Sequence, residues 1–221
     1  MRILAFVLFA FVALPSISQQ DRNGHNPAVP DKPFTLTQVW TLDATYSDEQ
    51  HGVTFRYPRI WKPMAQFGYH PPALTEETPK PIAGFGYEEG GFPRDRVVGP
   101  YSTTNLEGFG IVYSAAPAAN TADCDARATS ISETPEHRTV VFGGRAYSER
   151  ETGEAGMSQS NSGKLYATYV HPICYLFETD VATASLDDIS GLTPEQVRVI
   201  ETHLLGIMKS VRIVPSEGKP D

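Results

Sequence analysis

The alternation of apolar and polar residues predicts a domain built mainly from short β-strands. Residues 53–57 (VTFRY) place an apolar side chain at every second position, and Pro58 ends this strand because proline has no N–H for a sheet hydrogen bond. A looser alternation predicts a first strand over residues 34–42, followed by a polar turn over residues 46–52. Further strands are predicted at residues 82–87 and 108–114.

Two antiparallel strand pairs are predicted further along the chain. Residues 137–142 and 145–151 flank a pair of glycines, which readily adopt the positive φ angles of a two-residue hairpin turn. Residues 165–170 and 174–183 form the second pair, on either side of a His-Pro turn. An antiparallel sheet is therefore expected.

The most distinct helix signal lies near the C-terminus. Thr193 is suited to cap the helix, Pro194 to open its first turn and Gln196 to complete a capping box, so a helix is predicted to run to about Lys209. Its apolar residues recur at intervals of three and four positions, which is typical of a helix with one face packed on a sheet.

A shorter, alanine-rich helix is predicted at residues 117–130, and a last strand at residues 211–214. Strands grouped together and covered by helices predict an α+β fold, in which helices cover a meandering antiparallel β-sheet. Residues 34–214 are predicted to form a single domain because they are too few to favour two, and residues 215–221 are predicted to form a polar tail.

The N-terminus has the pattern of a secretory signal peptide. A basic residue precedes an unbroken apolar run over residues 3–14, which is too short to span a bilayer, and small residues precede a cleavage point after Ser18. Residues 1–18 are therefore predicted to be a signal peptide and residues 19–33 a flexible leader. The mature protein is expected to be secreted or periplasmic, with no membrane span after cleavage.

The two cysteines, Cys124 and Cys174, are expected to form a disulfide. An even number of cysteines in an exported protein usually indicates a bridge, and the chain has no Cys-x-x-Cys spacing of the kind found in redox motifs. The formal net charge is −8 and the basic residues are scattered, so binding to nucleic acid is not expected.

Short motifs at both ends of the domain resemble the PsbP-like superfamily. They are Gly52–Trp61 (GVTFRYPRIW), which matches the family's Gly-x-x-Phe-x-Tyr-Pro-x-x-Trp strand, and Leu192–Pro194 with Met208–Arg212, which match its closing helix and Ser-Val-Arg strand. The resemblance implies a central antiparallel sheet between helices, which is an α/β/α sandwich. It also implies an exported accessory or binding protein rather than a catalyst, and it assigns no functional residue.

Catalytic, cofactor and metal motifs are not found in the sequence. Gly156–Ser160 (GMSQS) lacks the last glycine of a nucleophile elbow, and the histidines have no zinc-ligand spacing. His70 with Glu76-Glu77 is the best candidate metal trio, but no metal or cofactor is predicted. A secreted hydrolase whose groups meet only in the fold, around residues such as His70, His137 or His171, is the alternative to a binding protein.

Aromatic residues in and around a region rich in glycine and proline, residues 70–104, are the candidate ligand-binding residues. Core packing is one interpretation of these rings, and a groove for a peptide, glycan or apolar ligand is the other. The residues assigned to this candidate site are Phe85, Tyr87, Phe92 and Tyr101. The sequence thus predicts an exported, non-enzymatic domain that binds an unknown protein, peptide or glycan partner.

Overall fold

The computed structural model describes residues 33–64, 79–89, 99–132, 134–155, 159–184 and 190–214. The helices in these residues are α1 (Leu36–Trp40), α2 (Thr121–Ile131) and α3 (Pro194–Ser210). The strands are β1 (Ala44–Asp48), β2 (Val53–Tyr57), β3 (Lys62–Pro63), β4 (Ala83–Glu88), β5 (Leu106–Pro117), β6 (Arg138–Phe142), β7 (Arg145–Ala155), β8 (Gln159–Val170), β9 (Ile173–Ala184) and β10 (Arg212–Ile213). The predicted signal peptide, nearly all of the leader and the tail lie outside the described residues.

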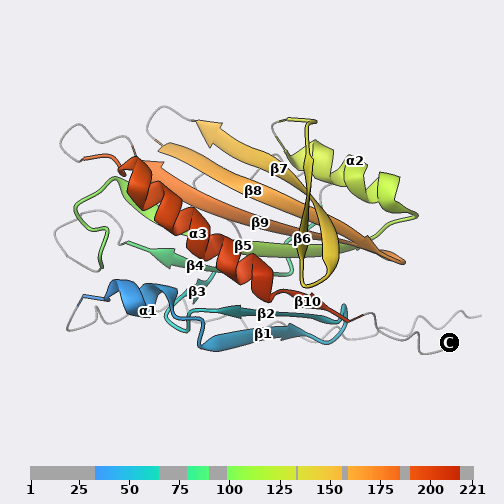
Figure 1. Ribbon diagram of the computed structural model, residues 1–221, viewed down its shortest axis with the longest axis horizontal. Helices are drawn as coiled ribbons and strands as arrows, with labels where there is room; N and C mark the ends of the chain where they lie inside the picture. The colour runs from blue at the N-terminus through green and yellow to red at the C-terminus, as the bar shows by residue number, and fades with distance from the viewer. Residues whose placement is uncertain are drawn as a thin grey trace, which may run out of the picture. The chain divides into compact units, whose positions relative to one another are not determined.

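The strands form two antiparallel sheets, so the α+β class predicted from the sequence is confirmed (Figure 1). The larger sheet has seven strands in the order β3-β4-β5-β9-β8-β7-β6, and the smaller has three in the order β1-β2-β10. In the smaller sheet, β2 pairs with both β1 and β10. The two segments that carry the PsbP-like motifs therefore meet in space, although they lie at opposite ends of the domain.

Both predicted strand pairs are present. The hairpin of β6 and β7 turns through Gly143 and Gly144, whose φ angles of 58° and 80° are in the left-handed region that favours glycine. Strands β8 and β9 pair from Val170 with Ile173 to Gln159 with Ala184, which makes them longer than the alternation indicated.

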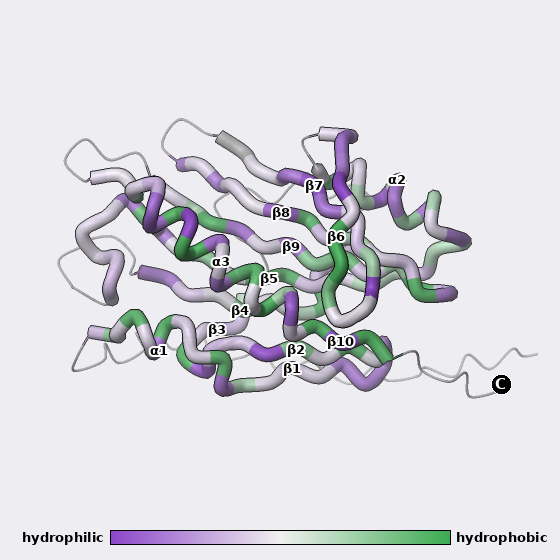
Figure 2. The backbone as a smooth tube through the Cα atoms, in the orientation of Figure 1, coloured by the Kyte–Doolittle hydropathy of each residue, from purple (hydrophilic) through white to green (hydrophobic). Residues whose placement is uncertain are grey.

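The C-terminal helix begins as the sequence predicts. The side chain of Thr193 accepts from the backbone N–H of Gln196, and the side chain of Gln196 accepts from the backbone N–H of Thr193. Figure 2 shows hydrophobic and hydrophilic residues alternating along α3, as expected for a helix with one buried face. Among the described residues, no helix combines the length and apolar character needed to cross a membrane.

Two predictions for the N-terminal part of the domain are wrong. Residues 34–42 contain the helix α1 rather than a strand, because Thr35 and Gln38 form a capping box that opens a helical turn. The start of the predicted polar turn is instead strand β1, which pairs with β2 along its whole length from Ala44 to Asp48. Both segments are short and rich in polar residues, so apolar alternation is a weak signal there.

Opposite faces of the large sheet pack against different helices. On β9, Tyr175 and Phe177 belong to the cluster that includes α3, whereas Cys174 and Leu176 belong to the cluster that includes α2. Successive residues of a strand point to opposite faces, so α2 and α3 cover opposite faces of the sheet. Figure 1 shows α3 crossing obliquely in front of the large sheet, between it and β10. We call the two sides of the large sheet the α2 face and the α3 face.

Candidate functional site

The sequence-predicted aromatic residues contribute to the core wherever the structure describes them. Tyr87 and Tyr101 are both 3% exposed and lie around Phe109, with ring centroids 5.3 and 5.9 Å from its ring. Phe85 is half-buried and stacks on Tyr57 at 4.0 Å. Phe92 lies outside the described residues, so ligand binding by Phe85, Tyr87, Phe92 and Tyr101 stays a prediction.

The predicted disulfide is present between Cys124 of α2 and Cys174 of β9. It lies on the α2 face, where Arg150 is also buried. The guanidinium of Arg150 donates to the carboxylate of Asp125 and to the carbonyl of Pro135, each at 2.5 Å. These links attach α2 to the sheet and leave no accessible ionic group of Arg150 for a ligand.

The histidines of the described residues do not assemble a serine-type site. His171 shares a hydrogen bond with the Tyr169 hydroxyl at 2.8 Å, and His51 pairs with Asp48 at 2.6 Å. The Asp48 carboxylate also accepts from the Tyr113 hydroxyl at 3.3 Å. Burial opposes ionisation of Asp48, but the hydrogen bonds from His51 and Tyr113 outweigh it and lower the pKa of the carboxyl. In the part of the chain that the structure describes, no serine hydrogen-bonds to either of the paired histidines.

Metal binding receives no support from the described residues, in which no three histidine, cysteine, aspartate or glutamate side chains gather closely enough to hold an ion. The candidate trio of His70 and Glu76-Glu77 lies outside the described residues.

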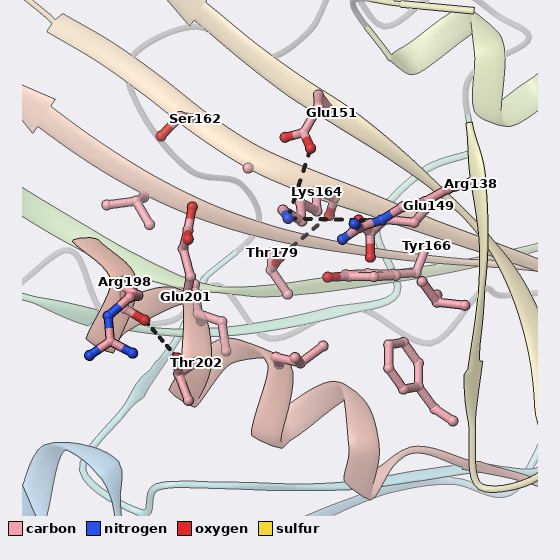
Figure 3. Close-up of a pocket in the computed structure, with 16 residues that line it drawn as sticks. Arg138, Glu149, Glu151, Ser162, Lys164, Tyr166, Thr179, Arg198, Glu201 and Thr202 are labelled. Atoms are coloured by element: carbon pink, nitrogen blue, oxygen red, sulfur yellow. Dashed lines mark hydrogen bonds and ion pairs between the residues drawn. The ribbon is translucent and has the colours of Figure 1, made fainter. Parts of the chain in front are cut away.

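A cleft lies on the α3 face, between α3 and strands β6 to β9. Its volume is about 290 Å³. The side chains from the strands are those that alternate toward α3, and the helix contributes one flank (Figure 3). We call this feature the α3 cleft. Its lining residues are Arg138, Val140, Phe142, Glu149, Glu151, Ser162, Gly163, Lys164, Tyr166, Thr179, Val181, Arg198, Glu201, Thr202, Leu204 and Leu205.

The strand side of the α3 cleft contains a buried carboxylate that is neutralised by two cations. The side chain of Glu149 is 4% exposed, and its Oε1 atom lies 2.6 Å from Arg138 and 3.6 Å from Lys164. Lys164 also lies 3.8 Å from Glu151, an approach that is visible in Figure 3. Adjacent strands place these residues in register, since Arg138 is the cross-strand partner of Glu149 and Lys164 that of Glu151. Two cations and two carboxylates therefore balance on this side.

Tyr166 brings a hydroxyl without a hydrogen-bond partner into the same cleft. Its residue is 2% exposed, its ring packs edge-on against Phe142, and its hydroxyl forms no hydrogen bond with any of the described residues. Burial raises the pKa of Tyr166, and the negative charge of Glu149 raises it further, so the hydroxyl stays protonated. The oxygen itself is not among the buried polar atoms that lack a partner, so it is open to the cleft and available to a ligand atom or a water molecule.

The helix side of the α3 cleft carries an unbalanced carboxylate next to apolar side chains. Figure 3 shows Glu201 directed from α3 toward the strands, whereas the guanidinium of Arg198 is directed away from them. Arg198 pairs instead with Glu195, at 2.6 and 3.0 Å. The apolar part of the lining consists of Val140, Phe142, Val181, Leu204 and Leu205.

A second hollow lies at the turn between β6 and β7, beside β10. Its two arginines are already used within the protein. Arg145 donates to the carbonyl of Ile213, and Arg212 donates to the carbonyls of Lys209 and Val211. These bonds tie the hairpin and the C-terminus of α3 to β10. The two arginines therefore have a structural role that requires no ligand.

Sequence reasoning missed the α3 cleft. Its polar residues come from four strands and a helix, and the charged ones are divided among β6, β7, β8 and α3, so no spacing motif connects them. One signal was present in the chain. The predicted strand at residues 165–170 follows Ser162 and Lys164, whose alternation with Tyr166 places three polar groups on one face.

Comparison with known proteins gives no family for the chain. No protein-family model matches it, and no curated protein matches its sequence. Several solved structures resemble it, and two of them have a TM-score of 0.42. One is a protein of Bacteroides thetaiotaomicron VPI-5482, at 12% identity over 81% of this chain and 52% of that chain. The other is LpqN of Mycobacterium tuberculosis, described as involved in cell envelope biogenesis, at 10% identity over 78% of this chain and 90% of that chain.

These similarities are too low to carry a functional argument. The chain spans about half of the Bacteroides protein. The PsbP-like resemblance is not confirmed by any of the comparisons and stays a prediction.

Proposed function

We propose that the chain is an exported, non-enzymatic binding domain that holds a ligand or a segment of a partner in the α3 cleft. The observation that carries this proposal is the Tyr166 hydroxyl, which opens into the cleft from an otherwise buried ring and has no hydrogen-bond partner among the described residues. A few polar groups converging on an apolar hollow are typical of binding sites. The apolar side chains around Tyr166 would contact the body of the ligand, and the hydroxyl would fix its orientation.

An extracytoplasmic location belongs to the same proposal. The Cys124–Cys174 disulfide supports it, because such bridges persist mainly in oxidising compartments. The pattern of residues 1–18 supports export through a cleaved signal peptide. The opposite placement of α2 and α3 and the pairing of β2 with β10 support a PsbP-like sandwich as the finer description of the fold.

The alternative of a secreted hydrolase has one structural element in its favour, the Asp48–His51 pair. A nucleophile is required as well, and the hydroxyl that contacts this pair belongs to Tyr113, whose pKa is raised by burial and by the charge of Asp48. Such a phenol is a poor nucleophile at neutral pH. We therefore propose binding rather than hydrolysis.

The proposal is tested by closing the cleft. Ser162 lies at the exposed end of the lining on β8, so Ser162→Trp would place an indole across the cleft without disturbing the core. Ser47→Trp on β1 is the matched control, because Ser47 is also an exposed strand residue and does not line the cleft. Both variants and the parent protein are purified from the extracytoplasmic fraction of the native host, and native mass spectrometry records what each one retains.

The expected result is a bound species that accompanies the parent protein and Ser47→Trp but is absent from Ser162→Trp. Near-ultraviolet circular dichroism shows whether each variant keeps its tertiary structure. A bound species that survives in folded Ser162→Trp would contradict the proposal, and so would the absence of any bound species from the parent protein.

A further inference from the structure

One carboxylate of the α3 cleft is left without an ion-pair partner among the described residues, although the lining has as many cations as carboxylates. Arg138 and Lys164 lie against Glu149 and Glu151 on the strand side, which gives two charges of each sign. On the helix side, Glu195 neutralises Arg198 outside the lining. Glu201 remains, and no residue of the described chain forms an ion pair with it. The flank formed by α3 therefore presents one carboxylate without an ion-pair partner among the described residues.

A second, independent feature points to the same ligand chemistry. The Tyr166 hydroxyl has no hydrogen-bond partner in the described part of the chain, and it opens from a ring that is otherwise buried into the same cleft as Glu201. A protonated phenol can accept a hydrogen bond through its oxygen while it donates its own proton. A ligand group that donates several hydrogen bonds and carries a positive charge would satisfy both the phenol and Glu201.

Apolar side chains lie next to these two groups. Leu204 and Leu205 follow Glu201 by three and four residues, so they share its side of α3. Phe142 contacts the Tyr166 ring edge-on, with centroids 5.6 Å apart. The ligand therefore needs a flexible apolar body as well as a cationic head.

We propose that the α3 cleft selects an aliphatic ammonium group, with Glu201 as its counter-ion and the Tyr166 hydroxyl as its hydrogen-bond partner. This inference rests on the proposed function and specifies its ligand. A lysine side chain of a partner and a free polyamine both carry the required chemistry. Arg138 and Lys164 already pair with Glu149 and Glu151, whereas Glu201 has no such partner among the described residues.

The test measures which head group the cleft prefers. The folded mature domain, labelled with ¹⁵N, is titrated with hexylamine, with the neutral isostere 1-hexanol and with the anion hexanoate, while amide chemical shifts report both location and affinity. We expect hexylamine to shift amides of β8 and of α3 around Glu201, and to bind more tightly than the other two probes. Binding should weaken at high ionic strength, because Glu201 is exposed and salt screens its charge.

Variants assign the two roles. Glu201→Gln is expected to weaken the binding of hexylamine about threefold to fivefold, as for the loss of an exposed ion pair. Tyr166→Phe is expected to weaken it by a factor of about two to ten, as for one hydrogen bond, with no change in salt dependence. Glu201→Lys should reverse the preference from hexylamine to hexanoate. Glu49→Gln is the matched control and should have no effect, because Glu49 is an exposed acid outside the cleft.

Two further probes distinguish the sources of the ammonium group. Spermidine represents free polyamines, and the peptide acetyl-Ala-Lys-Ala-amide represents a partner's lysine, with its norleucine analogue as the uncharged control. Whichever of the two probes binds more tightly identifies the source of the ammonium group. If no ammonium probe shifts the cleft amides, or if Glu201→Lys leaves the preference for hexylamine unchanged, the inference is overturned.

A failure of this inference is distinguishable from a failure of the proposed function. Hexanoate or 1-hexanol binding in the cleft at least as tightly as hexylamine would overturn the ammonium assignment while leaving the cleft as a binding site. Only persistence of the native bound species in Ser162→Trp, or its absence from the parent protein, contradicts the binding site itself.

Discussion

On the α2 face of the large sheet the packed side chains are mostly small, whereas on the α3 face most of them are aromatic or branched. The α2 cluster consists of Ala118, Cys124, Ala128, Leu165, Ala167, Cys174 and Leu176. The α3 cluster includes Phe109, Ile111, Tyr113, Tyr147, Tyr166, Tyr175, Phe177, Ile200, Leu204, Ile207 and Met208. Stabilisation by burial grows with apolar area, so the α2 helix gains far less from packing than α3 does.

The difference shows how each helix is attached. The α2 helix is fixed by a few specific links, the disulfide to β9 and the ion pair with Arg150 of β7. The α3 helix is fixed by an apolar stripe that contacts β2, β5 and β6. Because this stripe is sufficient to hold α3, the neighbouring side of the helix is free to line a cleft with polar residues such as Glu201.

Loss of the disulfide should have the largest effect, and it should fall on α2. Replacing both Cys124 and Cys174 with Ala is expected to cost about 4 kcal/mol in the free energy of unfolding, from the loop entropy of a 50-residue separation. Urea unfolding followed by tryptophan fluorescence measures this loss. Hydrogen exchange under native conditions should show that the double variant exchanges its amides faster than the parent protein does, with a larger increase in α2 than in α3. Equal acceleration in the two helices would contradict the proposed difference in attachment.

The ion pair beneath α2 should give the next largest effect. Asp125→Ala leaves the guanidinium of Arg150, which is 1% exposed, without its carboxylate, so we expect a loss of about 2 kcal/mol after allowing for the partial exposure of Asp125. Arg150→Met removes the buried charge together with the pair and should cost less. Thermal or urea unfolding compares the two variants.

An exposed helix pair supplies the control for that prediction. Glu195→Ala removes the partner of Arg198 on the solvent side of α3, where both side chains are more than half exposed, and should leave stability unchanged within error. If Glu195→Ala lowers the free energy of unfolding as much as Asp125→Ala does, burial of the ion pair does not determine how much the pair contributes to stability.

Elements with a strong local signal were predictable from the sequence. The glycine pair of the β6–β7 turn requires positive φ angles, and Thr193 with Gln196 requires a helix start, so each acts without help from distant residues. The α1 helix has the same kind of signal in Thr35 and Gln38, but the apolar residues around it suggested a strand. The capping box is the better guide there because it specifies hydrogen bonds, whereas a short apolar pattern fits either element.

The candidate site was predictable only in part, for a physical reason. Tyr87 and Tyr101 were recognised as large aromatic residues, yet the structure buries them around Phe109, because a ring's burial depends on what the remote strands place next to it. The α3 cleft depends on the register that sets Arg138 opposite Glu149 and on the side of α3 that Glu201 occupies. Pairing register and helix rotation are tertiary properties, so no local pattern contains them.

The smallest expected effect concerns the α3 face and depends on pH. The His203 ring of α3 stacks on Trp40 with centroids 4.5 Å apart, and desolvation there lowers the pKa of His203 below its ordinary value of 6.5. Between the folded and the ordinary pKa, the unfolded chain binds more protons than the folded one. The contribution of His203 to stability is therefore fully present above about pH 7 and is lost as the pH falls through the folded pKa.

His203→Phe keeps a ring on Trp40 but cannot titrate, so it isolates this contribution. Urea unfolding of the parent protein and the variant at several pH values between about 5 and 8 should show a shallower decline for the variant on acidification. All other titrating groups are shared, so the difference between the two curves reports His203 alone. If the two curves are parallel, His203 makes no pH-dependent contribution to the free energy of unfolding. The apolar stripe of α3 would then hold this face at every pH tested.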